Sequence, residues 1–277
     1  MAAMDSRYLM RDYNTAGSEW QRLDELHNGI RIFLDGQLSL ADISNPREII
    51  DIGAGSGAWA LQAAQMFPEA HVVASDISPL PPRLFPPNVT FEEIDILKPI
   101  SGKQECFDVV HIRLVLYHIL EKHIHDVLEK ATMMLKPGGW LLIEDFGRHT
   151  GHETSKGPAM ATFEKMYIGM LRSKGLDPII GEHVQEYLKE LNSFSEINAN
   201  CERLVLTTNE DNAGSKVRAL SDAVRVTIER LVTGVIGEDM KSVGLTPELQ
   251  KAWKDERNDP AFHTTYDFWF TWSRKKM

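Results

Sequence analysis

Cysteine, net positive charge and long apolar runs are scarce in this sequence, and each shortage argues against a class of protein. The 277 residues include only two cysteines, Cys106 and Cys201, too few for a disulfide framework or a cysteine zinc site. A formal net charge of -10, without a stripe of Lys and Arg, argues against DNA or RNA as a partner. No stretch approaches membrane-spanning length, and the first residues lack a signal-peptide core. We therefore expect a cytoplasmic protein that binds neither nucleic acid nor a membrane.

Metal-ligand spacing is also missing. The ten histidines include no HExxH pattern, and the cysteines form no CxxC pair, so no recognisable set of ligands shares one face of a helix or turn. We predict that the protein holds no metal. Internal repeats and low-complexity tracts are absent as well, and no pattern indicates an oligomeric state.

From about residue 46 onward, short β-branched runs alternate with helical patterns. That alternation is typical of a parallel sheet covered by helices, so the sequence predicts the α/β class. We expect strands at 48–52, 71–75, 89–92, 108–112, 140–144, 201–208 and 266–273, and, besides the crossover helices, helices at 18–38, 158–172, 181–191 and 217–235.

The length favours one domain with additions over two small domains. We interpret residues 1–45 as an N-terminal helical cap, because apolar residues recur at helical spacing before the first strand. Residues 46–277 form the main domain, with helical insertions, expected to act as a lid, at about 150–180 and 213–258.

A glycine turn between a strand and a helix is the strongest local signal. The sequence Glu-Ile-Ile-Asp-Ile at 48–52 leads into Gly53, Gly55 and Gly57, and a helical pattern follows at 58–66. Glycines let a ligand approach the backbone closely, and the following helix N-terminus favours a carboxylate or phosphate. A merely tight turn gives the same pattern, so this motif alone leaves both interpretations open.

Acids at the ends of the next two strands add to this signal. Asp76 follows the glycines by about 20 residues, where it could accept hydrogen bonds from ribose hydroxyls, as in NAD-binding proteins. The alternative is that it caps the turn that follows at Ile77. Asp95 ends the third strand and could accept from the amino group of adenine.

Five segments of the sequence are similar to motifs of a known family. They are Glu-Trp-Gln-Arg-Leu at 19–23, the glycine turn at 51–59, Ser-Asp-Ile-Ser-Pro at 75–79, Phe-Asp-Val-Val-His-Ile-Arg at 107–113, and Leu-Lys-Pro-Gly-Gly-Trp at 135–140. In this order, from about Tyr13 to Asp145, they resemble the class I S-adenosylmethionine-dependent methyltransferases. More narrowly, the chain resembles the fungal secondary-metabolite and LaeA-like methyltransferases.

The resemblance implies a Rossmann-like, seven-stranded, mostly parallel sheet with helices on both faces, and S-adenosylmethionine as cofactor. It assigns the methionine end of the cofactor to the glycines, the ribose to Asp76, the sulfonium side to Arg113 and to the backbone near His111, and a closing role to the leading segment. Arg22 in that segment could also be a solvated charge, and Tyr13 a ring at the edge of the core. The implied cofactor residues are Tyr13, Arg22, Asp51, Gly53, Gly55, Gly57, Asp76, Ile77, Asp95, Ile96, His111 and Arg113.

Methyl transfer needs the acceptor to be held against the methyl group and water to be excluded, and a base helps only some acceptors. His118 and Asp145 follow strands four and five, where open α/β sheets bind ligands. We name them as candidate catalytic or orienting groups, against a partly exposed histidine and a loop cap. Candidate substrate residues, which could also be core, are Tyr117, His149, Phe163, Tyr167, Met170 and Ile228.

The resemblance and the aromatic and apolar candidate substrate residues together favour oxygen or nitrogen methylation of a small aromatic or apolar secondary metabolite. Two other functions stay open: a LaeA-like regulator that keeps the cofactor fold, and an enzyme that keeps the cofactor but performs another reaction. A nicotinamide dehydrogenase is disfavoured by the glycine spacing and by Asp95.

Overall fold

The computed structural model describes residues 17–150, 157–206, 214–262 and 264–277. Two of the candidate residues fall outside this description: Tyr13 entirely, and His149 for its side chain.

Seven strands form one mixed sheet. In space their order is β3-β2-β1-β4-β5-β7-β6, and all neighbours pair in parallel except β7, which is antiparallel to both β5 and β6. The strands are β1 Glu48–Ile52, β2 His71–Asp76, β3 Val89–Glu93, β4 Phe107–Arg113, β5 Leu135–Thr150, β6 Phe194–Val205 and β7 Thr265–Lys275. This arrangement confirms the predicted α/β fold with a seven-stranded, mostly parallel sheet.

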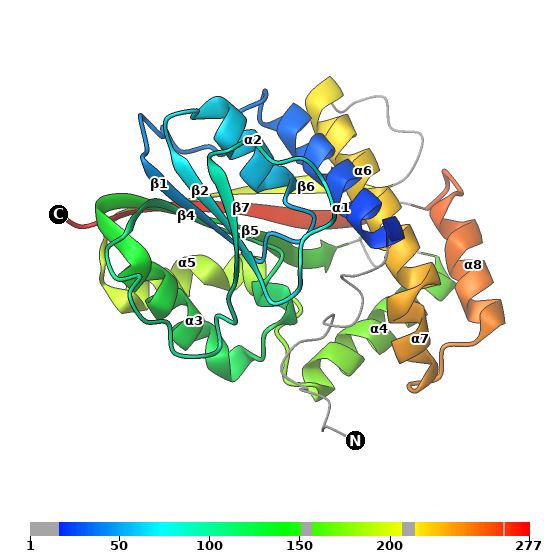
Figure 1. Ribbon diagram of the computed structural model, residues 1–277. Coiled ribbons are helices and arrows are strands. Elements are labelled where there is room, and N and C mark those ends of the chain that lie inside the picture. Colours follow the sequence, from blue (N-terminus) through cyan, green and yellow to red (C-terminus); the bar gives the residue numbers. More distant parts are fainter. Residues whose placement is uncertain (1–16, 151–156, 207–213, 263) are drawn as a thin grey trace, which may run out of the picture.

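Helices cover the sheet on two sides (Figure 1). In that view α1, α2 and α6 lie above the sheet, α3 and α5 lie below it, and α4, α7 and α8 gather at one end. The helices are α1 Gly17–Phe33, α2 Ala58–Met66, α3 Glu121–Met134, α4 Pro158–Ser173, α5 Ile180–Leu191, α6 Ser215–Thr233, α7 Val235–Lys241 and α8 Pro247–Arg257, with a 3₁₀ turn η1 at Leu116–His118.

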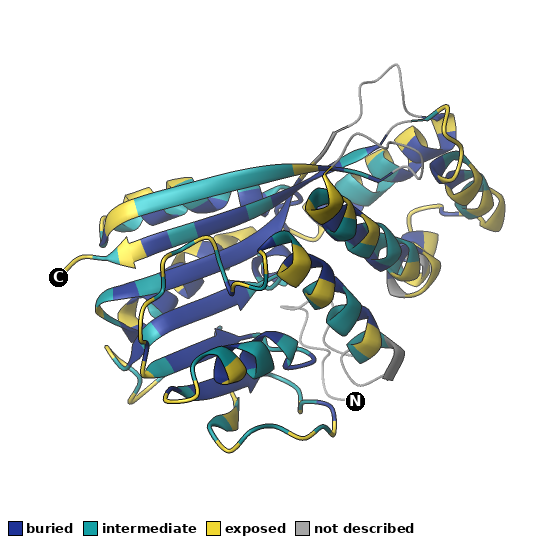
Figure 2. Cartoon of the chain, turned by 90° about the horizontal axis from the view of Figure 1, so that it is seen from above, coloured by how far each residue is buried: buried dark blue, intermediate teal, exposed yellow. Residues whose placement is uncertain are grey.

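The central strands are apolar on both sides, as strands sandwiched between helices must be. In β1, Ile49 packs with the Trp59 side of α2, whereas Ile50 belongs to the larger core on the other face. Figure 2 shows the inner strands buried along their length and the helices buried along one side only. The rigid sheet therefore holds the ends of its strands in fixed positions.

Several elements differ in extent from the expected ones, including β5, which covers Leu135–Thr150 rather than 140–144. Helix α1 ends at Phe33 rather than 38, because Asp35 and Gly36 adopt positive φ angles of 57° and 80°. Strand β6 begins at Phe194 rather than 201; it is an edge strand, and its polar residues hide the usual pattern. Helix α8 lies in a region where only a helical insertion was expected. Within the described residues, no helix has the length and apolar character needed to span a membrane.

Candidate active site

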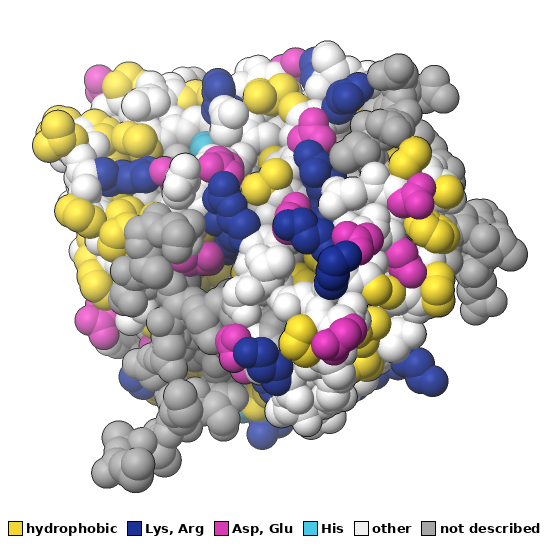
Figure 3. Space-filling model, turned by 90° about the vertical axis from the view of Figure 1, so that its right-hand side faces the viewer, with side chains coloured by type: hydrophobic (Ala, Val, Ile, Leu, Met, Phe, Trp, Pro, Cys, Tyr) yellow, Lys and Arg dark blue, Asp and Glu magenta, His cyan; other side chains and the backbone are white. Residues whose placement is uncertain are grey.

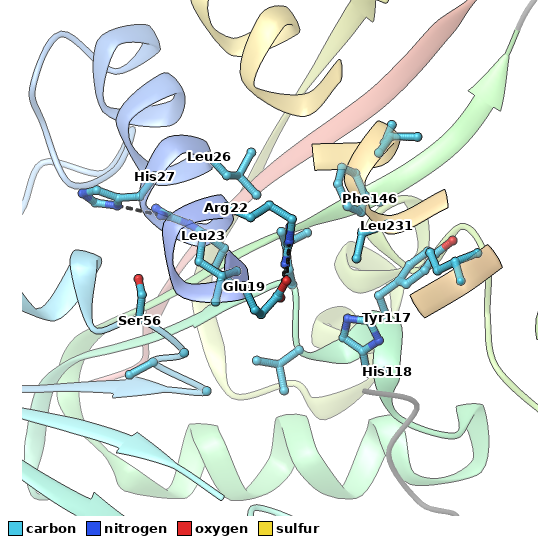
Figure 4. A pocket seen from close by; sticks show the side chains of 18 of the residues that line it. Glu19, Arg22, Leu23, Leu26, His27, Ser56, Tyr117, His118, Phe146 and Leu231 are labelled. Carbon is cyan, nitrogen blue, oxygen red and sulfur yellow. Dashed lines mark hydrogen bonds and ion pairs between the residues drawn. The ribbon is translucent and has the colours of Figure 1, made fainter. Parts of the chain in front are cut away.

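A cavity of about 260 Å³ opens at the carboxyl ends of the parallel strands. It lies where the strand order reverses between β1 and β4, the usual ligand position in open α/β sheets. Side chains from α1 enter it on one side, and Tyr117 and His118 enter from another (Figure 4). The cavity runs from the glycine turn to a group of aromatic side chains, so two molecules could meet inside it.

The glycine turn is shaped by left-handed backbone. Gly53, Gly55 and Gly57 have φ angles of 73°, 56° and 76°, a region that side chains other than glycine rarely tolerate. Their N–H groups are bonded within the protein: Gly53 donates to Ser75 O, Gly55 to Asp76 and Gly57 to Ala54 O. The glycines therefore serve mainly to shape the turn, and the first N–H groups of α2 are left to face a ligand.

Asp76 supports the turn from the end of β2. One carboxylate oxygen accepts the Gly55 N–H at 2.8 Å, and the other accepts the Ser78 N–H at 3.0 Å. The same side chain lines the cavity, and its burial raises the pKa of the carboxyl group above the usual value. Both interpretations of Asp76 thus have a physical basis, since an oxygen that accepts from the turn still has lone pairs for a ligand.

Asp51 and His111 form a buried pair at the wall of the cavity. The imidazole Nδ1 lies 2.7 Å from Asp51 Oδ1, and the Trp59 ring stacks on the His111 ring at 3.9 Å between centroids. The other carboxylate oxygen of Asp51, Oδ2, is buried and has no hydrogen-bond partner among the described residues. A buried orphan acceptor is costly, so this atom is suited to receive a donor from a bound ligand.

A second set of polar groups joins this pair to helix α1. Arg113 Nε donates to Glu144, whose Oε2 lies 3.6 Å from His111 Nε2, and Arg113 Nη1 lies 3.0 Å from His27 Nδ1. Burial alone would raise the pKa of Glu144, but Arg113 and His111 outweigh it and lower that pKa to about 2. Burial and the charge of Arg113 lower the pKa of His27 to about 3. His27 is therefore neutral and accepts the bond that holds α1 to β4.

Helix α1 also forms part of the roof. Arg22 is 6% exposed, is ion-paired with Glu19 and lines the cavity (Figure 4). Leu23 approaches the glycine turn closely enough that a Cβ atom on Gly55 would lie 3.0 Å from Leu23 Cδ1. A solvated surface position for Arg22 is thereby ruled out.

His118 lines the cavity beside Tyr117, with the two ring centroids 5.8 Å apart (Figure 4). Its Nδ1 is buried without a hydrogen-bond partner among the described residues. Burial and the nearby charge of Arg22 lower the pKa of His118 to about 4. The imidazole is therefore neutral at physiological pH and is a weak base, but it can still hydrogen bond to an acceptor molecule.

Asp145 does not line the cavity. It is 1% exposed, and it accepts hydrogen bonds from the backbone N–H groups of Phe146 and Tyr117. Burial raises the pKa of Asp145 to about 7, against the effect of these hydrogen bonds. This carboxyl group thus fixes the turn that carries Tyr117 and His118 instead of touching a ligand.

Most of the other candidate residues meet in the cavity. Ile77 and Ile96 line it near the glycine turn, and Phe163, Tyr167 and Ile228 line it at the aromatic end. Besides Asp145, three candidates do not line it: Gly57, Asp95 and Met170. Asp95 accepts from the Leu97 N–H and pairs with Lys98, while Met170 is core.

The sequence hypothesis missed several residues of this site. His27 and Trp59 lie inside or beside recognised segments but carried no recognisable role. Trp253 and Tyr266 come from α8 and β7, far along the chain, and only the fold brings them to the cavity. Of the two acids ending the fifth strand, Glu144 rather than Asp145 contacts the cavity residues His111 and Arg113.

A Rossmann-like sheet with a glycine turn, an acid at the end of β2 and a deep cavity at the strand ends defines an enzyme of the nucleotide-cofactor type. The family described as "Methyltransferase domain" matches residues 27–192. The chain belongs to this methyltransferase family. This membership confirms the predicted enzyme class and its S-adenosylmethionine cofactor.

Two relatives come from the fungus Strobilurus tenacellus. Methyltransferase str2 is 36% identical over 242 residues, which cover 86% of this chain and 85% of that protein. Methyltransferase str3 is 40% identical over 182 residues, or 65% of each chain. Fungal secondary metabolism regulators named laeA match over less than half of this chain. The similarity to fungal methyltransferases is thus broader than the similarity to the regulators.

The fold has solved counterparts. Phosphoethanolamine N-methyltransferase 2 of Haemonchus contortus, in complex with S-adenosyl-L-methionine, superimposes with a TM-score of 0.58 at 16% sequence identity. The match covers 100% of this chain, which spans 61% of that chain. At this identity the likeness supports the fold alone.

Proposed function

We propose that this enzyme transfers the methyl group of S-adenosylmethionine to an oxygen or nitrogen atom of a small aromatic or apolar secondary metabolite. The observation that carries the proposal is the cavity that joins the glycine turn to the aromatic end, with His118 in its wall. The fungal relatives support a role in secondary metabolism.

The polar end of the cavity fits the cofactor. The unpartnered Oδ2 of Asp51 would accept from the α-ammonium group, and the N-terminus of α2 with Arg22 would face the α-carboxylate. Asp76 would accept from the ribose, and Ile77, Ile94 and Ile96 would surround the adenine. Asp95 would help only by shaping the loop after β3, because its side chain does not line the cavity.

The chemistry asks little of the side chains. The bound cofactor supplies an electrophilic methyl group, and the acceptor atom must displace the thioether in line. His118 would orient the acceptor through a hydrogen bond, and the helices α1 and α6 would exclude water. Because His118 is a weak base, we assign it an orienting role and leave the acceptor proton to solvent after transfer.

Three measurements test this function. Titration calorimetry should show S-adenosylmethionine and S-adenosylhomocysteine binding, and NAD not binding. Radiolabelled methyl groups from the cofactor should then appear in a compound extracted from a fungal metabolite mixture.

His118→Ala should lower kcat more than it raises the acceptor KM. Cofactor binding without label transfer to any extract would contradict catalysis and favour a regulatory role.

A further inference from the structure

Six aromatic side chains enclose the end of the cavity opposite the glycine turn. They come from η1, β5, α4, α8 and β7, and we call them the aromatic chamber: Tyr117, Phe146, Phe163, Tyr167, Trp253 and Tyr266. Their rings contact one another edge to face and stacked. The centroids of Phe146 and Tyr266 lie 5.0 Å apart, and those of Phe163 and Trp253 lie 5.3 Å apart. The wall is therefore continuous and suits a flat apolar ring.

The polar atoms that these rings bring into the chamber include three hydroxyl groups, which are bonded in a row. Tyr117 donates to Tyr167 at an O···O distance of 3.3 Å, and Tyr117 is also hydrogen bonded to Tyr266. Each hydroxyl has one proton, and Tyr117 gives its proton to Tyr167. When Tyr117 donates to Tyr167 in this way, its hydrogen bond with Tyr266 uses the Tyr266 proton, and the Tyr167 proton is left for another acceptor.

The hydroxyls stay protonated. Burial raises the pKa of Tyr117 well above its usual value and that of Tyr167 to about 12. A neutral phenol donates one hydrogen bond and carries no charge with which to balance an ion.

The charges around the cavity point to an uncharged guest. Its arginines are already paired, Arg22 with Glu19, Arg113 with Glu144 and Arg148 with Glu182. His27 and His118 are neutral, as their lowered pKa values show. An anionic acceptor would therefore lose its hydration without gaining a counterion. Glu164 also lines the wall and would attract a cation. A cationic acceptor would, however, lie in the same cavity as the positively charged sulfonium of the cofactor, which would repel it.

We propose that the aromatic chamber selects an uncharged aromatic acceptor and that the Tyr167 hydroxyl, oriented through Tyr117 and Tyr266, donates a hydrogen bond to an oxygen atom of that molecule. This selection rests on the proposed function, because it names the class of acceptor for the same cavity. Tyr266 and Trp253, which no sequence motif marks, are then specificity residues of the enzyme.

Three naphthalene probes test the selection by calorimetry on protein saturated with S-adenosylhomocysteine. They share the ring and differ in one substituent: 2-acetylnaphthalene has a carbonyl oxygen, 2-ethylnaphthalene has none, and 2-naphthoate is an anion. We expect the ketone to bind about 2- to 10-fold more tightly than the ethyl compound, the range for one neutral hydrogen bond. We expect the naphthoate to bind more weakly than the ketone.

Single substitutions distinguish the donor hydroxyl of Tyr167 from the Tyr117 and Tyr266 hydroxyls that orient it. Tyr167→Phe should remove the advantage of the ketone and leave the affinity of the ethyl compound nearly unchanged. Tyr117→Phe should reduce that advantage partly, and Tyr266→Phe least, because the Tyr167 proton remains in both. Tyr187→Phe on α5, outside the cavity, is the matched control and should bind all three probes as the wild type does.

Two results would overturn the inference. One is equal affinity of the wild type for the ketone and the ethyl compound. The other is tighter binding of a charged probe than of the ketone, whether the naphthoate or a fourth probe, the cation 2-naphthylmethylammonium. These failures differ from failure of the proposed function. If S-adenosylhomocysteine itself does not bind, the cofactor assignment fails. If it binds and the probes show no preference, only the selection by the chamber fails.

Discussion

The two ends of the cavity are built in different ways. The cofactor end is polar, its acids accept hydrogen bonds or form ion pairs, and its lining residues lie between Glu19 and Arg113. The aromatic chamber is apolar and draws its side chains from five elements between Tyr117 and Tyr266. Backbone shape determines the first end and side-chain packing determines the second. Substitutions should therefore affect the first through single glycines and acids, and the second through distributed contacts.

Gly53→Val should give the largest effect, and it should act on the cofactor end. Valine tolerates the φ angle of 73° poorly, and a Cβ atom there would lie 2.3 Å from Val115 Cγ2. We expect S-adenosylhomocysteine affinity to fall about 100-fold or more in calorimetry. The control is Gly169→Ala on α4, where a Cβ atom meets nothing within 4 Å. A folded Gly53→Val protein with wild-type affinity would contradict the backbone-shaped turn.

Asp76→Ala should give the next largest effect at the same end. It removes the acceptor for the Gly55 and Ser78 N–H groups and an oxygen of the cavity wall. We expect the dissociation constant for S-adenosylmethionine to rise roughly 10- to 100-fold. An unchanged constant, together with native circular dichroism, would mean that the ribose is held elsewhere and that the turn tolerates the loss.

Asp145 holds the turn that carries Tyr117 and His118, so its titration should sharpen the comparison. Its raised pKa means that the folded state prefers the protonated form, so the stability it contributes is present below pH 4 and is lost as pH rises through about 7. Between pH 5 and pH 7 the wild type should lose roughly 1 to 2 kcal/mol of unfolding free energy relative to Asp145→Asn. Denaturant unfolding at several pH values measures this difference, and parallel curves for the two proteins would refute it.

Gly29→Ala should give the smallest effect but act on both ends together. Gly29 on α1 packs so tightly on α6 that a Cβ atom would lie 2.4 Å from Ala223 Cβ. Ion pairs such as Glu25 with Arg230 also join the two helices, and Figure 3 shows side chains of both charges next to one another on this end of the molecule.

Helix α1 lines the cofactor end and α6 lines the chamber. Forcing them apart should therefore weaken S-adenosylhomocysteine and 2-acetylnaphthalene by about 3- to 10-fold each. Gly169→Ala again serves as the control, since it adds the same methyl group to a helix without a clash. Loss at one end alone would show that the two helices do not act together.

The sequence predicted best what local backbone patterns determine. The strand, glycine turn and helix at 48–66, and the acid at Asp76, need no knowledge of distant contacts, and the structure brings them together as expected. The polar edge strand β6 was predicted too short, because its alternation is not apolar against polar. Neighbouring residues in a strand face opposite sides, so the sequence alone could not decide between Glu144 and Asp145.

The chamber was harder to predict because no short segment carries it. Phe163, Tyr167 and Ile228 were identified from helical spacing, which does not distinguish a cavity wall from core, and Met170 on the same helix proved to be core. Tyr266 belongs to a strand that was predicted correctly, but its contact with Tyr117 depends on where that strand enters the sheet.

The position of β7 also has a consequence for folding. Of the seven strands it is the last to be synthesised, yet it lies between β5 and β6, and β6 pairs with no other strand. Until β7 emerges from the ribosome, β6 has no partner and β5 presents an open edge, so both are exposed to mispairing or to chaperones. Pairing β5 with β7 closes a loop of more than a hundred residues, a non-local step that slows folding. Refolding should therefore be limited by the insertion of this strand.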